Sequence, residues 1–262
     1  MAHGRTGSKW FPSARAEVAL LFVALLLTGC RAAQHPTLTL SIAASLQGAL
    51  VEIESNYQRD HGTVEFRNNF GASGTLAREI EQGAPVDAIL SAGAKPIDDL
   101  QAKGLLTPGT RTNLLRNTLV LIAPQDSKLT SFDDLDGPGV RLLAIGDPAS
   151  VPAGQYGQQT LNALKLYDKL HDKIVLGKDV RQVLTYVETG NADAGLVYGT
   201  DAHMSTKVRV VAVAPEASHD PIVYPLAIVA GSRNQEATRD FVTYLGSPEA
   251  KAIFIKHGFT MA

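Results

Sequence analysis

The stretch "GASGTLAREI" (residues 71–80) places Ser73 between small residues, at the point where a strand-like segment gives way to helical spacing. The same arrangement occurs in "IAASLQGALVEI" (residues 42–53), where Ser45 follows two alanines. A third helix start made of small residues is "VPAGQYG" (residues 151–157). Serine is a favoured helix N-cap, so both serines are expected to cap their helices. Three such junctions in one chain indicate a shared target in front of the helix starts.

Strand-like and helix-like segments alternate over residues 37–104 and again over residues 141–199, which is typical of βαβ units. Long apolar strands are predicted at residues 116–124 and 222–230. We therefore expect an α/β fold of two lobes, with mostly parallel sheets flanked by helices and hinged by two crossover strands. Lobe 1 would hold residues 37–118 and 225–262, and lobe 2 residues 119–224. A single doubly wound sheet is the alternative that this pattern leaves open.

The N-terminus has the features of an export signal. Arg5, Lys9 and Arg15 precede ten apolar residues (18–27), a run shorter than the roughly 20 residues of a spanning helix. The following "LTGC" (residues 27–30) resembles the bacterial lipobox, in which the cysteine is lipidated, and Cys30 is the only cysteine of the chain. We expect residues 1–29 to be a lipoprotein signal peptide and residues 30–36 a tether. A plain signal peptide with a chance cysteine is the alternative.

Charge and length exclude several classes of protein. Without residues 1–29 the chain has 233 residues, with 21 Lys and Arg against 25 Asp and Glu, a net charge of −4. Such a chain can bury a good core, and an acidic protein without a basic run is not expected to bind nucleic acid. We expect a monomer that touches the membrane only through its lipid anchor.

Four predicted helix starts could bind an anion, at Ser45, Ser73, Ala153 and Val180. A helix N-terminus presents unpaired backbone N–H groups and a partial positive charge, so it can hold an anion without Lys or Arg. Tyr198 ends a predicted strand in "GLVYGTDA", where its hydroxyl could reach a polar partner at the mouth of a cleft.

Each of these residues also has a purely structural interpretation. The two serines could be plain caps, and Ala153 could belong to a proline-led turn. Val180 lies on an apolar stripe behind Asp179, which is itself a good cap. Tyr198 could be a core tyrosine, which is commoner than a ligand-binding one.

Several motifs together resemble the molybdate-binding proteins of bacterial ABC importers. They are "FGASGTLA", "GDPASVPAGQYG", "KDVRQVL", "VYGTDA" and "IFIKHGF", and the resemblance extends from about Thr37 to Phe259. It implies a two-lobe, type II periplasmic-binding-protein fold that holds molybdate or tungstate between its lobes. It implies oxyanion contacts through the hydroxyl and N–H groups of Ser45 and Ser73, the N–H groups of Ala153 and Val180, and the phenol of Tyr198.

The resemblance also implies the rest of the function. The chain would be no enzyme, would need no cofactor and no direct metal ligand, and would deliver its oxyanion to an ABC permease with its ATPase. Other members often carry more serines where this chain has Ala72 and Gly74, and an acidic residue where it has Gly93.

Three other functions compete with this interpretation. The same clamp could bind another oxyanion, such as sulfate or thiosulfate. A serine hydrolase using Ser73 is disfavoured, because Thr75 stands where a G-x-S-x-G nucleophile motif needs glycine. A metal-cation binder is disfavoured because the implied pocket has no cluster of His or carboxylate ligands.

Overall fold

A computed structural model describes residues 1–4, 7, 35–62 and 64–262. The proposed lipidation site Cys30 and nearly all of the signal peptide and tether lie outside these residues. Residues 36–262 form one compact unit. Within the part of the chain that is described, no helix combines the length and apolar character that crossing a membrane requires.

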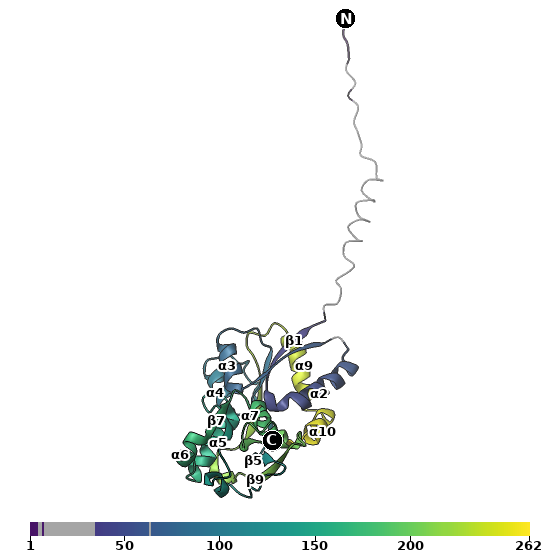
Figure 1. The fold of residues 1–262 in the computed structure, drawn as a ribbon. Coiled ribbons are helices and arrows are strands. Elements are labelled where there is room, and N and C mark those ends of the chain that lie inside the picture. The colour runs from purple at the N-terminus through teal and green to yellow at the C-terminus, as the bar shows by residue number, and fades with distance from the viewer. Residues whose placement is uncertain (5–6, 8–34, 63) are drawn as a thin grey trace. The chain divides into compact units, whose positions relative to one another are not determined.

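Two sheets build this unit (Figure 1). The first has six strands, in the spatial order β11 (Thr260–Met261), β4 (Thr112–Arg116), β10 (Val223–Ile228), β3 (Ala88–Leu90), β1 (Thr37–Ala43) and β2 (Glu65–Gly71). The second has five, in the order β7 (Ile174–Gly177), β6 (Leu143–Gly146), β8 (Ala194–Tyr198), β5 (Leu119–Pro124) and β9 (Val208–Val213).

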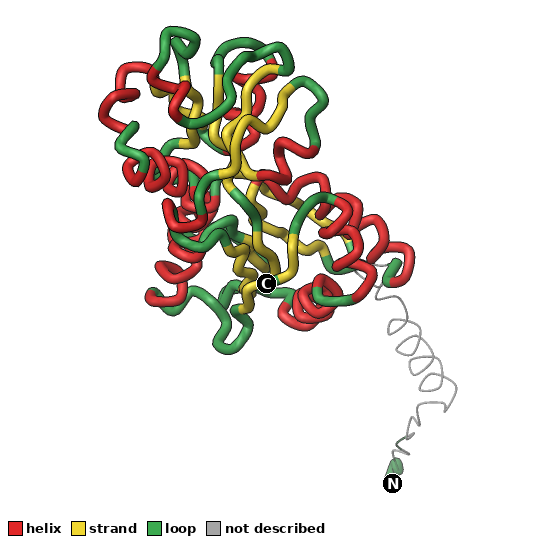
Figure 2. The backbone as a smooth tube through the Cα atoms, turned by 90° about the horizontal axis from the view of Figure 1, so that it is seen from below, coloured by secondary structure: helices red, strands yellow, loops and turns green. Residues whose placement is uncertain are grey.

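Helices flank the strands of both sheets (Figure 2). With the first sheet lie α2 (Gln47–Asp60), α3 (Ser73–Glu81), α4 (Ala94–Ala102), α9 (Gln235–Leu245), α10 (Pro248–Lys256) and the 3-10 turn η1 (Ala44–Leu46). With the second lie α5 (Pro152–Ala163), α6 (Tyr167–Leu170), α7 (Val180–Glu188), α8 (Gly199–His203) and the short turns η2 (Asp133–Asp136), η3 (His171–Lys173) and η4 (Glu216–Ser218). We call the first sheet with its helices lobe 1 and the second with its helices lobe 2.

The two-lobe α/β fold is thus as predicted, but the sheets are mixed rather than mostly parallel. The βαβ units give the parallel pairs β1–β2, β1–β3, β6–β7 and β6–β8. By contrast, β10 runs antiparallel to β3 and β4, and β5 runs antiparallel to β8 and β9. A helical crossover within one sheet produces a parallel pair. Because β5 and β10 enter from the other sheet, that constraint does not apply to them.

The predicted strand at residues 116–124 is shorter in the structure, because its first residues carry the chain from one sheet to the other. β4 ends at Arg116 in lobe 1 and β5 begins at Leu119 in lobe 2, so Asn117 and Thr118 carry the chain across. The return crossing lies between Val213 and Val223, at the end of β9 and the start of β10. The lobe boundaries and a hinge at these crossings stay predictions.

Candidate functional site

All five predicted contact residues lie at the ends of strands or the starts of helices. Ser45 lies in η1, directly after β1, and Ser73 is the first residue of α3. Ala153 is the second residue of α5, Val180 the first of α7, and Tyr198 the last of β8. Each is buried, with at most 4 % of its surface exposed. The first two belong to lobe 1 and the other three to lobe 2.

Ser73 and Tyr198 meet at one residue, Ala92, although they belong to different lobes. The Ala92 N–H donates to Ser73 Oγ over 2.9 Å, and Tyr198 Oη donates to the Ala92 carbonyl over 3.0 Å. Burial raises the pKa of Tyr198 well above its ordinary value of 10, so the phenol stays a neutral donor. Ala92 therefore joins the two predicted contacts across the lobe boundary.

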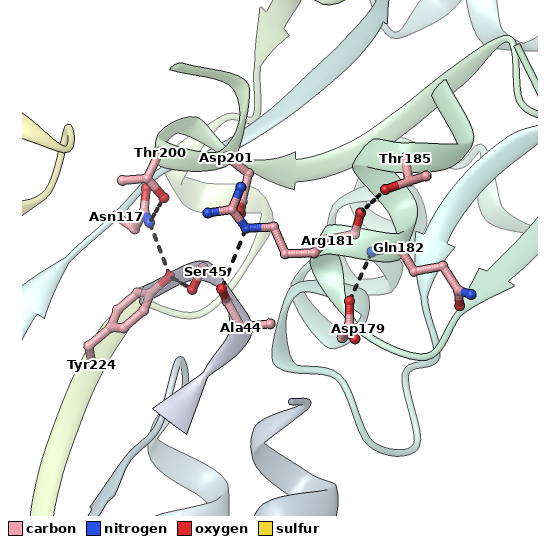
Figure 3. A network of polar contacts seen from close by, with 10 residues as sticks. All are labelled: Ala44, Ser45, Asn117, Asp179, Arg181, Gln182, Thr185, Thr200, Asp201 and Tyr224. Carbon is pink, nitrogen blue, oxygen red and sulfur yellow. Dashed lines mark hydrogen bonds and ion pairs between the residues drawn. The ribbon is translucent and has the colours of Figure 1, made fainter. Parts of the chain in front are cut away.

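Ser45 lies in a second polar network, drawn in Figure 3. Its hydroxyl is 2.9 Å from Tyr224 Oη, which also accepts from Asn117 Nδ2 over 3.1 Å. Asn117 Nδ2 also donates to Thr200 Oγ1, 2.9 Å away. The network links the start of η1 to β10, to a crossing segment and to α8. Tyr198 belongs to the same neighbourhood, because its ring centroid lies 5.7 Å from that of Tyr224.

The serines do not cap their helices, which corrects the prediction. The cap positions are Ala43 for η1 and Ala72 for α3, and neither serine accepts from its own helix. Ser73 is already inside the helix, so its oxygen is free to accept from the distant Ala92 N–H. Asp179, in contrast, is the expected cap of α7, since its carboxylate accepts from the Gln182 N–H over 2.8 Å.

Ala153 and Val180 offer only their backbone N–H groups as donors. As the second and first residues of their helices, they have N–H groups without a partner inside the helix. Such groups, together with the helix dipole, attract an anion.

The two lobes touch through backbone at this site. The Gly74 N–H donates to the Ser150 carbonyl over 3.0 Å, and a Cβ atom on Gly74 would lie only 2.7 Å from that oxygen. A Cβ atom on Gly93 would lie 3.0 Å from Pro152 Cβ. Two positions where this chain departs from the family pattern are therefore places of close approach between the lobes.

An ion pair between a partly exposed arginine and a buried carboxylate lies beside the site and was not predicted. Arg181 Nε lies 3.0 Å from Asp201 Oδ1, and Asp201 is completely buried. Burial raises the pKa of Asp201 to about 6, although the charge of Arg181 opposes that rise. Both residues belong to quoted motifs, "KDVRQVL" and "VYGTDA", but their separation of 20 positions gives no sign that they meet.

The arrangement suits a small anion better than a cation. Hydroxyl, phenol and backbone N–H groups converge from both lobes, and the nearby guanidinium is already paired with a carboxylate. The described residues include no group of three or more His, Cys, Asp or Glu that could hold a metal ion.

The comparisons with known proteins agree with this arrangement. The model of the bacterial extracellular solute-binding protein family matches residues 38–260. YvgL of Bacillus subtilis, whose name describes an ABC transporter substrate-binding lipoprotein, is 46% identical over 93% of this chain and 96% of its own. The molybdate-binding protein ModA of Haemophilus influenzae is 41% identical over 90% of this chain and 96% of its own.

A solved structure shows the same fold. The periplasmic molybdate-binding protein of Azotobacter vinelandii superposes with a TM-score of 0.78, at 25% identity, over 86% of this chain and 99% of its own. The chain therefore belongs to the bacterial extracellular solute-binding protein family and, within it, to the family of periplasmic molybdate-binding proteins that its motifs indicated.

Proposed function

We propose that this protein is the substrate-binding lipoprotein of an ABC importer and captures molybdate, or tungstate, between its lobes. The observation that carries the proposal is the convergence of uncharged donors from both lobes, where Ser73 and Tyr198 meet at Ala92. Its permease and ATPase would be the partners, and the protein would act as a monomer without a cofactor and without catalysis.

The hydrogen bonds indicate how each hydroxyl would act. Ser73 accepts from Ala92, so its own proton remains free to donate to an oxyanion. Tyr198 already donates its one proton to the Ala92 carbonyl, so a contact with the ligand requires that proton to turn away. Ser73 is thus the stronger contributor of the two.

A site made of donors also selects among oxyanions. Inorganic phosphate loses its last proton only in strongly basic solution, so near pH 7 the anion still carries at least one proton. That proton needs an acceptor, and leaving it buried and unpaired costs about 1–3 kcal/mol. Molybdate, tungstate and sulfate carry no proton at this pH. Of these, sulfate is the smallest, so donors spaced for molybdate would make longer and weaker bonds to it.

Titration calorimetry at neutral pH tests the proposal. We expect molybdate and tungstate to bind with similar affinity, sulfate much more weakly and phosphate most weakly. Ser73→Ala should weaken molybdate binding by about 1.5–3 kcal/mol, the usual scale for a hydrogen bond to a charged group. Sulfate binding as tightly as molybdate would instead assign the protein to a different oxyanion.

Ser41→Ala is the matched control for Ser73→Ala. Ser41 is equally buried, on β1, but its hydroxyl has no hydrogen-bond partner among the described residues. Its removal should leave molybdate affinity unchanged. If Ser73→Ala also binds like the wild type, Ser73 is a structural residue and not a ligand contact.

We further propose that Cys30 carries the lipid that anchors the protein to the cell envelope, as "LTGC" indicates. Two or more acyl chains hold a protein stably on a membrane, whereas one is marginal. Cys30→Ser should therefore move the protein from the membrane fraction to the soluble fraction of cells. An unchanged membrane share would exclude the anchor.

A further inference from the structure

Arg181 connects the two lobes without belonging to the predicted ligand contacts. It follows Val180 on α7, in lobe 2, and its Nε–H donates over 3.4 Å to the carbonyl of Ala44, in η1 of lobe 1 (Figure 3). The same Nε lies 3.0 Å from Asp201 Oδ1, on α8 of lobe 2. One guanidinium thus holds a carboxylate of its own lobe and a carbonyl of the other.

The contact with Arg181 is the one role that the described residues show for the Asp201 carboxylate. The Nε–H of Arg181 donates to the Ala44 carbonyl, and the backbone N–H of Tyr198 also helps to stabilise the charged form of Asp201. A buried charge is costly unless it is paired, and here the largest compensation is the charge contact with Arg181. Asp201 therefore fixes the place of the guanidinium. The other titratable groups near this carboxylate are Asp179, Tyr198 and Tyr224, none of which supplies a second positive charge.

The position of Ala44 gives this contact a consequence for the ligand. Ala44 directly precedes Ser45, one of the proposed oxyanion contacts, so the bond from Arg181 holds the turn that presents Ser45. In an opening at the predicted hinge, Arg181 and Asp201 would move with lobe 2 and Ala44 with lobe 1. The bond can therefore exist only while the lobes are together.

We propose that Arg181 is a closure latch, a positioning residue that Asp201 aims at the Ala44 carbonyl and that slows release of the bound oxyanion without touching it. The proposal rests on the proposed function. It predicts a specific kinetic change: loss of the latch should accelerate release, whereas association should not become slower, because the latch does not attract the ligand from solution.

Two variants and one control test the latch. Arg181→Gln removes the guanidinium but leaves Asp201 as an unpaired buried charge, which could destabilise the fold. The double variant Arg181→Gln/Asp201→Asn removes both charges and avoids that cost. Arg141→Gln is the control, because Arg141 forms an exposed pair with Asp193, 3.7 Å away, within lobe 2.

Stopped-flow kinetics with molybdate measure association and release separately. We expect release to become about tenfold faster in both latch variants, with association no slower and the control like the wild type. An unchanged release rate in the double variant would reject the latch. Slower, salt-dependent association would also reject it, because that result would show Arg181 attracting the anion from solution instead.

Small-angle scattering gives a test that needs no ligand kinetics. The double variant should have a larger radius of gyration than the wild type, either free or in saturating molybdate. Equal radii under both conditions would reject the latch. A wild-type protein that binds no molybdate would reject the proposed function, while the ligand-free radii would still test the latch.

Discussion

Gly154→Ala is expected to lower the free energy of unfolding by about 3 kcal/mol or more, the upper end of what overpacking costs. A Cβ atom on Gly154 would lie 1.9 Å from the carbonyl oxygen of Gly146 and 2.5 Å from its carbonyl carbon. These are backbone atoms of β6, so no side-chain rotation can relieve the clash, and α5 must move off the strand. For a domain of this size the melting temperature should fall by roughly 6–12 °C.

Gly157→Ala, one turn later on the same helix, is the matched control. Its Cβ would meet Leu196 Cδ1 at 3.1 Å, the flexible end of a side chain. Alanine also favours a helix over glycine by about 1 kcal/mol, which offsets that contact. Urea unfolding should therefore separate the two variants clearly. Equal stabilities would show that α5 can shift on β6 at little cost.

Gly154 also shows what a small residue in the sequence does and does not reveal. The run "VPAGQYG" predicts a helix start that faces the shared target, and the helix does begin at Pro152. The structure shows a different need for the small residue at Gly154, because the backbone of β6 lies directly against it. A sequence shows that space is needed beside a residue, but not what occupies the space.

Local periodicity predicted most of the strands and helices, because burial on one face leaves its mark within a few residues. The errors concern relations between distant residues. The apolar run at residues 116–124 did not show that its first residues are a crossing segment and that the strand begins only at Leu119. The capping prediction for Ser73 failed because its partner, the Ala92 N–H, lies 19 positions away.

For the candidate site, the sequence likewise predicted local positions but not contacts between distant residues. The motifs placed Ser45, Ser73, Ala153, Val180 and Tyr198 at helix starts and a strand end, which is where they lie. Their contact with the ligand stays a proposal. The ion pair between Arg181 and Asp201 could not be predicted, because an acid and a base 20 positions apart pair only once the fold brings them together.

Glu54, on α2 of lobe 1, is a second buried carboxylate that the sequence did not reveal. It is 6 % exposed, and its Oε2 accepts from Asn68 Nδ2 over 2.8 Å. Its Oε1 and the Oδ1 of Asn68 have no donor among the described residues. Burial raises the pKa of Glu54 from 4.5 to about 7, against the opposing effect of the Asn68 hydrogen bond. The folded protein therefore favours the protonated, neutral form.

Glu54 should make the protein less stable as the pH rises. The pKa of Glu54 is higher in the folded protein than in the unfolded chain. The stability that the neutral carboxyl contributes is therefore fully present below about pH 4.5 and is lost by about pH 7. A shift of this size corresponds to about 3 kcal/mol at most. The raised pKa of Asp201, about 6, acts in the same direction, so wild-type stability alone cannot isolate Glu54.

The variant Glu54→Gln isolates the effect of Glu54 on stability, because glutamine has the same shape as glutamate and never ionises. Its amide can also donate to Asn68 Oδ1, the acceptor that has no donor in the wild type. In urea unfolding, the variant and the wild type should be similarly stable at pH 4.5. At pH 8 the free energy of unfolding of the variant should exceed that of the wild type by up to about 3 kcal/mol. Glu79→Gln is the control, since Glu79 accepts from Asn69 Nδ2 over 2.7 Å in a more exposed place. A stability difference between Glu54→Gln and wild type that stays constant from pH 4.5 to pH 8 would show that Glu54 is ionised throughout, with its charge compensated in the fold.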